Sequence, residues 1–415
     1  MNMETPSTWE LMISRHAKNE ARVISSRFIE KYSKKFEQRI LTNDLLYDLL
    51  FSYCSPATFI RLSQTCFAAY AAVHSYMGRS MNINRIFSRF FSDILGFRQL
   101  QARTGTLVSG SAALQFFDRS FYPDSDLDIY VPIEYRKDVG QFLFEEGYEF
   151  VPNSKQDEDF WDAVNHRRVL DTTGIYAFRG VSAVFTFQKD TLREELKVQL
   201  IVAVNCPMEV ILGFHSTCVM NVISFEKAYS LYPKATFEER RSLVCASDGP
   251  KQEPAMEKYA QRGWKMVTDT RVSDLETSFH YHQKVIRWIG DSHCWTIQLD
   301  VSDIPDKLRP DGASPRLFHD PVSASSWKLG YDNFFGGTME FALTDDDALY
   351  LRYVYASEDS LRMLETIKTK FEPLEELRGK AYYDMAYVSM CMLHFRFFSD
   401  VQAVVSAMAN AFNDF

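Results

Sequence analysis

Two aspartates separated by one leucine, Asp126 and Asp128, are the residues of this chain whose types and spacing best suit chemistry. They stand at the start of an apolar run that is typical of a strand, and residues two apart on a strand share a face. Both carboxylates therefore point the same way. Two hard oxygen ligands side by side suit Mg²⁺, which typically binds one or two carboxylates together with substrate phosphates. The pattern predicts a magnesium site.

A glycine and a serine, Gly110 and Ser111, lie between an apolar, strand-like run and the helix-favouring segment 112–117. Glycine supplies a flexible turn, and serine is a common helix N-cap. The free backbone amides at the start of a helix can bind a phosphate. We therefore expect a strand, a Gly-Ser turn, a short helix, an acidic loop and a second strand that begins with the two carboxylates.

Fourteen residues, 112–125, separate Gly110-Ser111 from Asp126-Leu127-Asp128. This arrangement resembles the signature of the polymerase-beta-like nucleotidyltransferase superfamily, over a core of about 105–225. The resemblance implies a mixed sheet flanked by helices, a triphosphate held at the Gly-Ser turn and metal ions bound by the aspartate pair. It also implies in-line attack of an acceptor hydroxyl on the α-phosphate of a nucleoside triphosphate. More loosely, the whole chain resembles fungal proteins with the same core.

The family also has a third carboxylate on a later central strand. The strand expected at 196–204 carries Gln199 at its inward position instead. An amide can orient a water or a ligand, but it is neutral and a poor base, and losing a charge weakens binding of a second metal ion. Two interpretations follow. In the first, the protein is an active enzyme whose catalytic residues are Asp126, Asp128 and Gln199. In the second, the protein keeps the fold but is catalytically impaired and acts as a binding protein.

A third interpretation gives the aspartate pair no such role. Asp-x-Asp after an apolar strand occurs by chance, and it is also a metal-binding motif in glycosyltransferases. The Gly-Ser pair at this distance favours the nucleotidyltransferase resemblance. The sequence identifies neither the base of the nucleotide nor the acceptor.

The segment 41–75 predicts two short helices, 41–54 and 59–73, joined by a Ser-Pro turn, with Thr42 or Asn43 as the first N-cap. The pair resembles an F-box, although the usual Leu-Pro opening is here Leu-Thr. The resemblance implies docking onto an adaptor subunit of ubiquitin ligases. The alternative is a helical hairpin that packs on its own domain.

Two smaller groups of metal-ligating side chains occur later in the chain. His215 and Cys218, three residues apart, are expected on one helix face. Two ligands alone do not make a zinc site, and cysteine is commonly buried, so packing is the simpler interpretation. The second group comprises His280, His282, His293 and Cys294 on a predicted strand and turn. No carboxylate lies at a fixed spacing from them, so exposed strand histidines are expected.

The composition is that of a globular protein. Its 415 residues, 46% hydrophobic and 14% aromatic, can bury a large core and predict two or three domains. The net charge of −9 disfavours general binding to nucleic acid, and no nucleic-acid partner is expected. The first hundred residues carry thirteen Lys and Arg against eight Asp and Glu. We interpret this modest basic surplus as charged helix faces that are exposed to solvent.

The chain carries neither a membrane signal nor a disulfide pattern. No segment reaches the roughly 18 apolar residues of a membrane span, and the N-terminus lacks the apolar core of a secretory signal. The seven cysteines are odd in number and contain no C-x-x-C pair, which predicts a reduced, cytoplasmic or nuclear setting.

We therefore predict an α+β protein in three regions. Residues 1–100 form a helical, F-box-like region, 101–245 a nucleotidyltransferase-like domain, and 255–415 a C-terminal α+β region after a linker rich in Gly and Pro. Amphipathic patterns predict helices at 9–37, 257–267 and 360–412.

Overall fold

The computed structural model describes residues 33–165, 180–245, 252–268, 281, 285–304, 320–331, 337–343 and 352–356. By its contacts the chain divides into two compact units, 1–81 and 82–415. This division differs from the three regions expected from the sequence. The helix predicted at 360–412 and most of the helix predicted at 9–37 lie outside the described residues.

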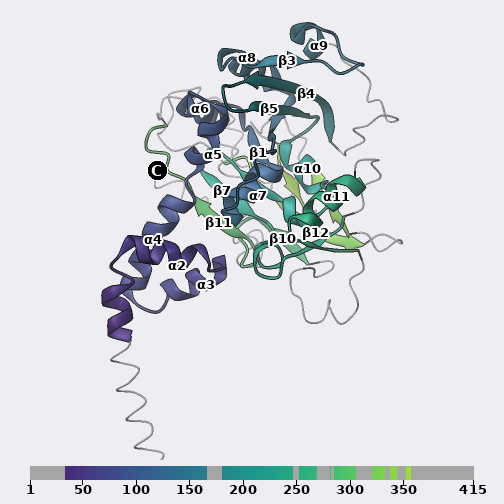
Figure 1. Ribbon diagram of the computed structural model, residues 1–415. Helices are drawn as coiled ribbons and strands as arrows, with labels where there is room; N and C mark the ends of the chain where they lie inside the picture. The colour runs from purple at the N-terminus through teal and green to yellow at the C-terminus, as the bar shows by residue number, and fades with distance from the viewer. Residues whose placement is uncertain are drawn as a thin grey trace, which may run out of the picture. The chain divides into compact units, whose positions relative to one another are not determined.

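In the first unit, residues 33–39 are helical, and α2 (Asp44–Ser52), α3 (Pro56–Ser63) and α4 (Phe67–Ser80) follow (Figure 1). The Asn43 side chain caps α2 by accepting from the amide of Leu46 at 3.3 Å, as predicted. The prediction of a single helix at 59–73 is wrong, because two helices, α3 and α4, cover this segment. Pro56 suits the first position of α3, and Cys66 caps a new helix after Ser63.

An aromatic cluster holds this unit together. The Phe51 and Phe59 rings each pack edge-on against Tyr76, with centroids 5.4 and 5.9 Å apart. Both phenylalanines are fully buried, and burying one such side chain contributes roughly 1.5–3 kcal/mol. Helix α2 therefore turns its aromatic residues inward, and its leucines lie on the exposed side.

The second unit begins with α5 (Ile83–Phe90) and α6 (Ile94–Thr104). The segment β1 (Leu107–Ser109), α7 (Gly110–Asp118) and β2 (Leu127–Pro132) follows. This order of strand, helix, loop and strand is the one predicted. Its Gly-Ser pair nevertheless lies inside the first turn of α7, so the prediction that Ser111 is the N-cap is wrong; Ser109 precedes the helix.

A mixed sheet forms the core of this unit. Within the described residues eight strands pair in the order β11-β7-β6-β1-β2-β5-β4-β3. The other strands are β3 (Glu149–Val151), β4 (Val181–Asp190), β5 (Glu195–Ala203), β6 (Asn221–Ile223), β7 (Lys227–Ser230) and β11 (Trp295–Gln298). Among the described strands of this sheet, only β2 and β5 pair in parallel. The α+β class and the strand predicted at 196–204 are confirmed, and β11 joins the C-terminal part of the chain to the same sheet.

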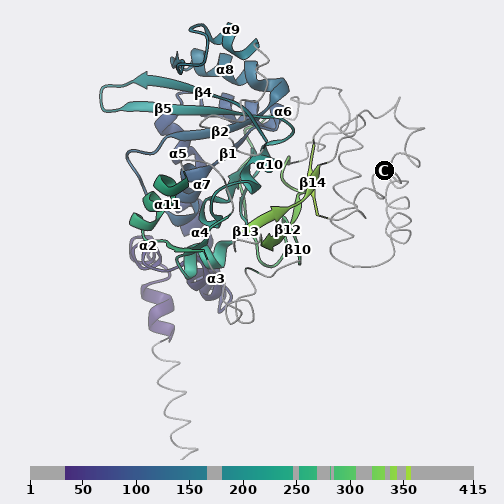
Figure 2. The same cartoon turned by 90° about the vertical axis from the view of Figure 1, so that its right-hand side faces the viewer.

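Helices α8 (Arg136–Glu145) and α9 (Phe160–Asn165) lie beside one end of this sheet, near β3, β4 and β5 (Figure 1). Aromatic side chains fill the space between them: Phe144, Phe150, Phe160, Phe185 and Phe187. Strands β4 and β5 form a long hairpin, which extends beyond its neighbours in Figure 2.

The remaining elements lie after β5. They are α10 (Pro207–Leu212), a 3₁₀ helix (Thr217–Val219), β8 (Arg241–Leu243), α11 (Gln252–Gln261), β9 (Lys265–Val267), β10 (Ile286–Trp288), β12 (Ser326–Tyr331), β13 (Gly337–Glu340), β14 (Ala342–Leu343) and β15 (Val354–Tyr355). The helix predicted at 257–267 is wrong in its bounds. The chain turns at Gly263, whose φ is +100°, and β9 then pairs with β8. Among the described residues, no helix combines the length and apolar character that crossing a membrane requires.

Candidate functional site

The aspartate pair lies at the start of β2, in the middle of the sheet. Asp128 pairs with Ser109 of β1 on one side and with Gln199 of β5 on the other. Side chains of paired positions in adjacent strands point to the same face. Asp126 was expected on the strand but lies just before its first residue, Leu127. The structure thus brings together Asp126, Asp128 and Gln199.

Gly110 approaches Asp128 more closely than any other residue type could. A Cβ atom at position 110 would lie 2.6 Å from Oδ2 of Asp128. The φ of Gly110 is +66°, which is unfavourable for a residue with a side chain. The absence of a side chain therefore allows the first turn of α7 to lie directly against the carboxylate.

Ser111 has a different position from the one expected. Its side chain is buried, its Oγ lies 3.0 Å from Oγ of Ser125, and Ser111 does not line the cavity beside Asp128. Gln115 donates to the same Ser125 oxygen at 2.9 Å and accepts from the amide of Tyr122 at 2.6 Å. The Ser111 side chain therefore ties α7 to the loop that carries Asp126.

Arg89 of α5 organises that loop from its other side. Its guanidinium donates to the carbonyl oxygens of Tyr122 and Ser125, each at 3.4 Å, and to that of Pro123. It also pairs with Glu194 at 2.5 Å. No sequence signal pointed to Arg89, because its partners lie more than thirty positions away.

Two lysines lie near the acidic pair, and an arginine lies near one of these lysines. Lys197 Nζ is 3.0 Å from Oδ2 of Asp126, and the Gln199 amide lies 3.4 Å from the same oxygen. Lys258 of α11 acts electrostatically on Asp126 and Asp128, and Arg262 is close enough to act on Lys258. Burial, and then the charge of Asp126, raises the pKa of Asp128 to about 7, although Lys258 and Lys197 act in the opposite direction.

The carboxylate pair could hold one magnesium ion. Mg²⁺ needs one or two carboxylates when phosphates and waters complete its shell. Burial and the charge of Asp126 disfavour the ionised form of Asp128 and raise its pKa, and a bound cation would stabilise that form. No group of three or more His, Cys, Asp or Glu residues occurs in the described part of the chain, so this fit rests on two carboxylates. Lys197 occupies one oxygen of Asp126 and would compete with a metal ion there.

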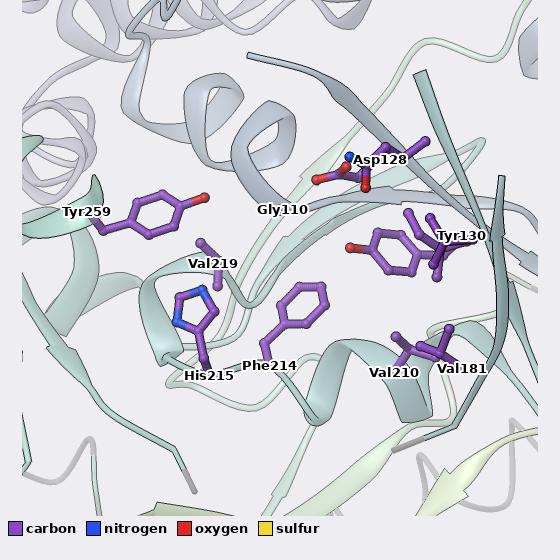
Figure 3. A pocket seen from close by; sticks show the side chains of 12 residues that line it. Gly110, Asp128, Tyr130, Val181, Val210, Phe214, His215, Val219 and Tyr259 are labelled. Carbon is purple, nitrogen blue, oxygen red and sulfur yellow. The ribbon is translucent and has the colours of Figure 1, made fainter. Parts of the chain in front are cut away.

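A cavity of about 170 Å³ adjoins Asp128 (Figure 3). It lies on the sheet face that carries Asp128 and Gln199. Twelve residues line it: Gly110, Asp128, Tyr130, Val181, Val184, Gln199, Ile201, Val210, Phe214, His215, Val219 and Tyr259. The hydroxyl groups of Tyr130 and Tyr259 point into the space between them from opposite sides.

His215 and Cys218 do not share a helix face, contrary to the prediction. Helix α10 ends at Leu212, and only a 3₁₀ helix of three residues follows His215. His215 lines the cavity, whereas Cys218 is fully buried and its backbone amide donates to the Ser242 hydroxyl at 3.0 Å. These two residues therefore make no joint site, and His280 and His282 lie outside the described residues.

His215 is instead a neutral group at the cavity. Its Nδ1 atom is buried and has no hydrogen-bond partner among the described residues. Burial, with the nearby charge of Lys258, lowers the pKa of His215 to about 4. The imidazole is therefore uncharged at neutral pH, with one nitrogen available to a ligand.

Sequence reasoning missed Tyr130, Lys258 and Tyr259 as site residues. Tyr130 stands two positions after Asp128 and could have been found by strand alternation. Lys258 and Tyr259 are more than 120 positions away and reach the site only through the packing of α11.

In comparisons with known proteins, no family model matched the chain, and searches of curated proteins and of solved structures found no match.

Proposed function

We propose that this protein is a nucleotidyltransferase-fold enzyme that transfers NMP from a nucleoside triphosphate to an acceptor hydroxyl with Mg²⁺. One observation carries the proposal: Asp128 lies against the start of α7, with only the hydrogen of Gly110 between them. A pair of carboxylates beside the free amides of a helix start can hold a metal-bound phosphate chain. The cations Lys197, Lys258 and Arg262 suit the charge of a triphosphate.

In this proposal, Mg²⁺ at Asp126 and Asp128 supplies Lewis-acid stabilisation of charge on the phosphoryl oxygens. Gly110 and the first turn of α7 orient the phosphates through backbone amides. The acceptor oxygen forms a bond to the α-phosphorus as the bond to the bridging oxygen breaks. The electron pair leaves with pyrophosphate, and the hydroxyl proton passes to water because Gln199 carries no basic group.

Thermal denaturation with Mg²⁺ and each nucleoside triphosphate tests this proposal. A ligand at about 100 times its dissociation constant stabilises a one-site protein by roughly 2.7 kcal/mol. We expect a Mg²⁺-dependent rise in melting temperature that the variant Asp126→Asn/Asp128→Asn loses. Asp124→Asn, an exposed aspartate of the same loop, is the matched control and should keep the shift. No shift with any nucleotide would refute the proposal.

A second candidate function is that of a catalytically impaired fold acting as a ubiquitin-ligase substrate adaptor. The observation that favours it is the exposed apolar surface of α2 and α4. Large fractions of these side chains are exposed: Leu45 79%, Leu46 43%, Leu49 58%, Leu50 37%, Tyr53 86%, Phe67 84% and Tyr70 48%. A large exposed apolar patch on a protein commonly marks an interaction surface.

Calorimetry with a purified adaptor subunit of ubiquitin ligases tests the second candidate. We expect binding that Leu45→Ser/Leu49→Ser abolishes, because both side chains lie on the exposed face of α2. Leu192→Ser changes a fully exposed leucine at the tip of the β4–β5 hairpin and should leave binding intact. Absence of binding by the unaltered protein would exclude this function for the adaptor used.

A further inference from the structure

The cavity beside Asp128 is mostly apolar. Five aliphatic side chains contribute to its wall: Val181, Val184, Ile201, Val210 and Val219. Phe214 adds an aromatic ring, which lies near the centre of Figure 3. Small-molecule sites commonly combine such a wall with a few polar groups that fix orientation. The lining thus has the composition of a site for a small ligand.

Besides Asp128 and Gln199, the polar side chains of the cavity are those of His215, Tyr130 and Tyr259. The buried Nδ1 atom of His215 has no partner among the described residues. The Tyr130 and Tyr259 hydroxyls point toward each other from opposite sides (Figure 3). A tyrosine hydroxyl has an ordinary pKa of about 10, so both groups carry their proton at neutral pH. A ligand there would meet three neutral hydrogen-bonding groups.

The cations of the site lie elsewhere. Lys197 pairs with Asp126, and neither Lys197, Lys258 nor Arg262 lines the cavity. An anionic group placed in the cavity would lose water and gain no counter-charge, which is costly. The site therefore has a cationic side at Asp126, suited to phosphates, and a cavity on the side of Asp128 and Gln199 that no cation lines among the described residues.

The size of the cavity limits its ligand. A cavity of about 150 Å³ holds one benzene ring. The cavity here, at about 170 Å³, has room for a single ring with a small substituent. It is too small for a nucleoside, so it does not hold both the base and the sugar of the nucleotide.

We propose that this cavity binds the acceptor, and that the acceptor is a small uncharged molecule carrying a hydroxyl group on an apolar body the size of one ring. The inference rests on the proposed nucleotidyl transfer. The hydroxyl faces Asp128 and Gln199, next to the phosphates, and His215 with the two tyrosines holds the other polar groups of the molecule. The new bond joins the hydroxyl oxygen to the α-phosphorus, pyrophosphate leaves, and the proton goes to water.

Binding of phenol, cyclohexanol and benzoate to the full chain tests the inference, measured by ligand-observed NMR. Separate samples measure the melting-temperature shift caused by Mg²⁺ and nucleoside triphosphate. We expect both alcohols to bind and benzoate to bind at least about tenfold more weakly, because its charge finds no counter-ion. Incubation with labelled triphosphate should then give an NMP-alcohol product.

The variant Val210→Phe fills the cavity and should weaken alcohol binding by more than about tenfold, because little room remains for a ring. It should retain the shift with Mg²⁺ and triphosphate. Val219→Leu repeats the test with a smaller change where Val210→Phe fails to fold. The control Val151→Phe alters an exposed position on β3 and should bind both alcohols normally.

The outcomes separate the two proposals. A nucleotide shift without binding of either alcohol, or equal alcohol binding by Val210→Phe, overturns the acceptor cavity and leaves nucleotide binding standing. If Mg²⁺ and nucleoside triphosphate cause no melting-temperature shift in the unaltered protein, nucleotidyl transfer is refuted. The proposal that the cavity binds the acceptor is then refuted as well, even if the alcohols bind.

Discussion

Asp128 and Gln199 lie opposite each other in the parallel pairing of β2 and β5. A carboxylate at position 199 would therefore stand beside Asp128 without any rearrangement of the sheet. We predict that Gln199→Glu raises the rate of NMP transfer by about tenfold or more, because a positioned general base contributes roughly 10²–10⁴-fold. Steady-state kinetics with saturating triphosphate measures the change.

The matched control for this prediction is Gln64→Glu, which adds the same charge at an exposed position in the first unit. Its rate should equal that of the unaltered protein. If Gln199→Glu is no faster, the third carboxylate is not what limits this site.

The contact between Gly110 and Asp128 predicts a large effect of Gly110→Ala. The left-handed backbone costs an alanine roughly 1–2 kcal/mol, and its Cβ would also lie 2.6 Å from Oδ2 of Asp128. We expect a lower free energy of unfolding and loss of the shift with Mg²⁺ and triphosphate. Urea denaturation and thermal denaturation measure the two effects.

Substitutions at two other glycines separate the effect of backbone strain from the effect of contact with Asp128. Gly263→Ala has a positive φ but no atom within 4 Å of the new Cβ, so it reports backbone strain alone. Gly78→Ala in α4 has neither feature and should be neutral or stabilising by up to about 1 kcal/mol. Equal losses for Gly110→Ala and Gly263→Ala would mean that contact with Asp128 adds nothing.

Glu146 binds the two residues that precede α6 and predicts a pH dependence. Its carboxylate accepts from the Ser92 amide at 2.7 Å, the Ser92 hydroxyl at 2.9 Å and the Asp93 amide at 2.8 Å. Burial acts to raise the pKa of Glu146, but these hydrogen bonds outweigh it and hold the pKa below its ordinary value of 4.5. The carboxylate therefore adds stability above pH 4.5, which is lost as the pH falls through the lowered pKa.

We expect Glu146→Gln to lower the free energy of unfolding at pH 7 by about 1–3 kcal/mol. The difference from the unaltered protein should shrink as the pH falls below 4.5. Urea denaturation across this range measures it, with the exposed neighbour Glu145→Gln as control. A difference that is the same at every pH would contradict the assigned role of the charge.

The buried pair Arg287 and Asp291 predicts a strong effect on stability. Arg287 Nε lies 2.5 Å from Asp291 Oδ2, and the two side chains are only 5% and 3% exposed. Arg287 also donates to the carbonyl of Leu231 at 3.0 Å and stacks on Tyr232 and Trp327. Removing one partner would leave an unpaired buried charge.

We expect Asp291→Asn to lower the free energy of unfolding by about 3–5 kcal/mol. The control is Asp48→Asn, which breaks the exposed pair with Arg79 and should cost less than about 1 kcal/mol. Urea denaturation of both variants measures the difference. Similar small losses would show that the buried pair is not needed for stability.

Local patterns predicted the segment that carries the candidate site. Strand alternation and the Gly-Ser turn indicated β1, α7 and β2, and the apolar run at 196–204 indicated β5. Such patterns depend on residues close together in the chain, so these elements could be predicted from the sequence. Element bounds were harder: Pro56 starts α3 instead of breaking the chain, and β9 follows α11 because β8 offers it a partner.

The sequence by itself determined the α+β class, the order of elements around Asp126 and Asp128, and the strand that carries Gln199. Only the tertiary structure decided that His215 and Tyr259 line one cavity with Asp128, because they come from segments far apart in the chain. It also decided that the aromatic side of α2 is buried and the leucine side exposed. Helical periodicity describes two apolar faces equally well, and the choice between them depends on what α3 and α4 present to α2.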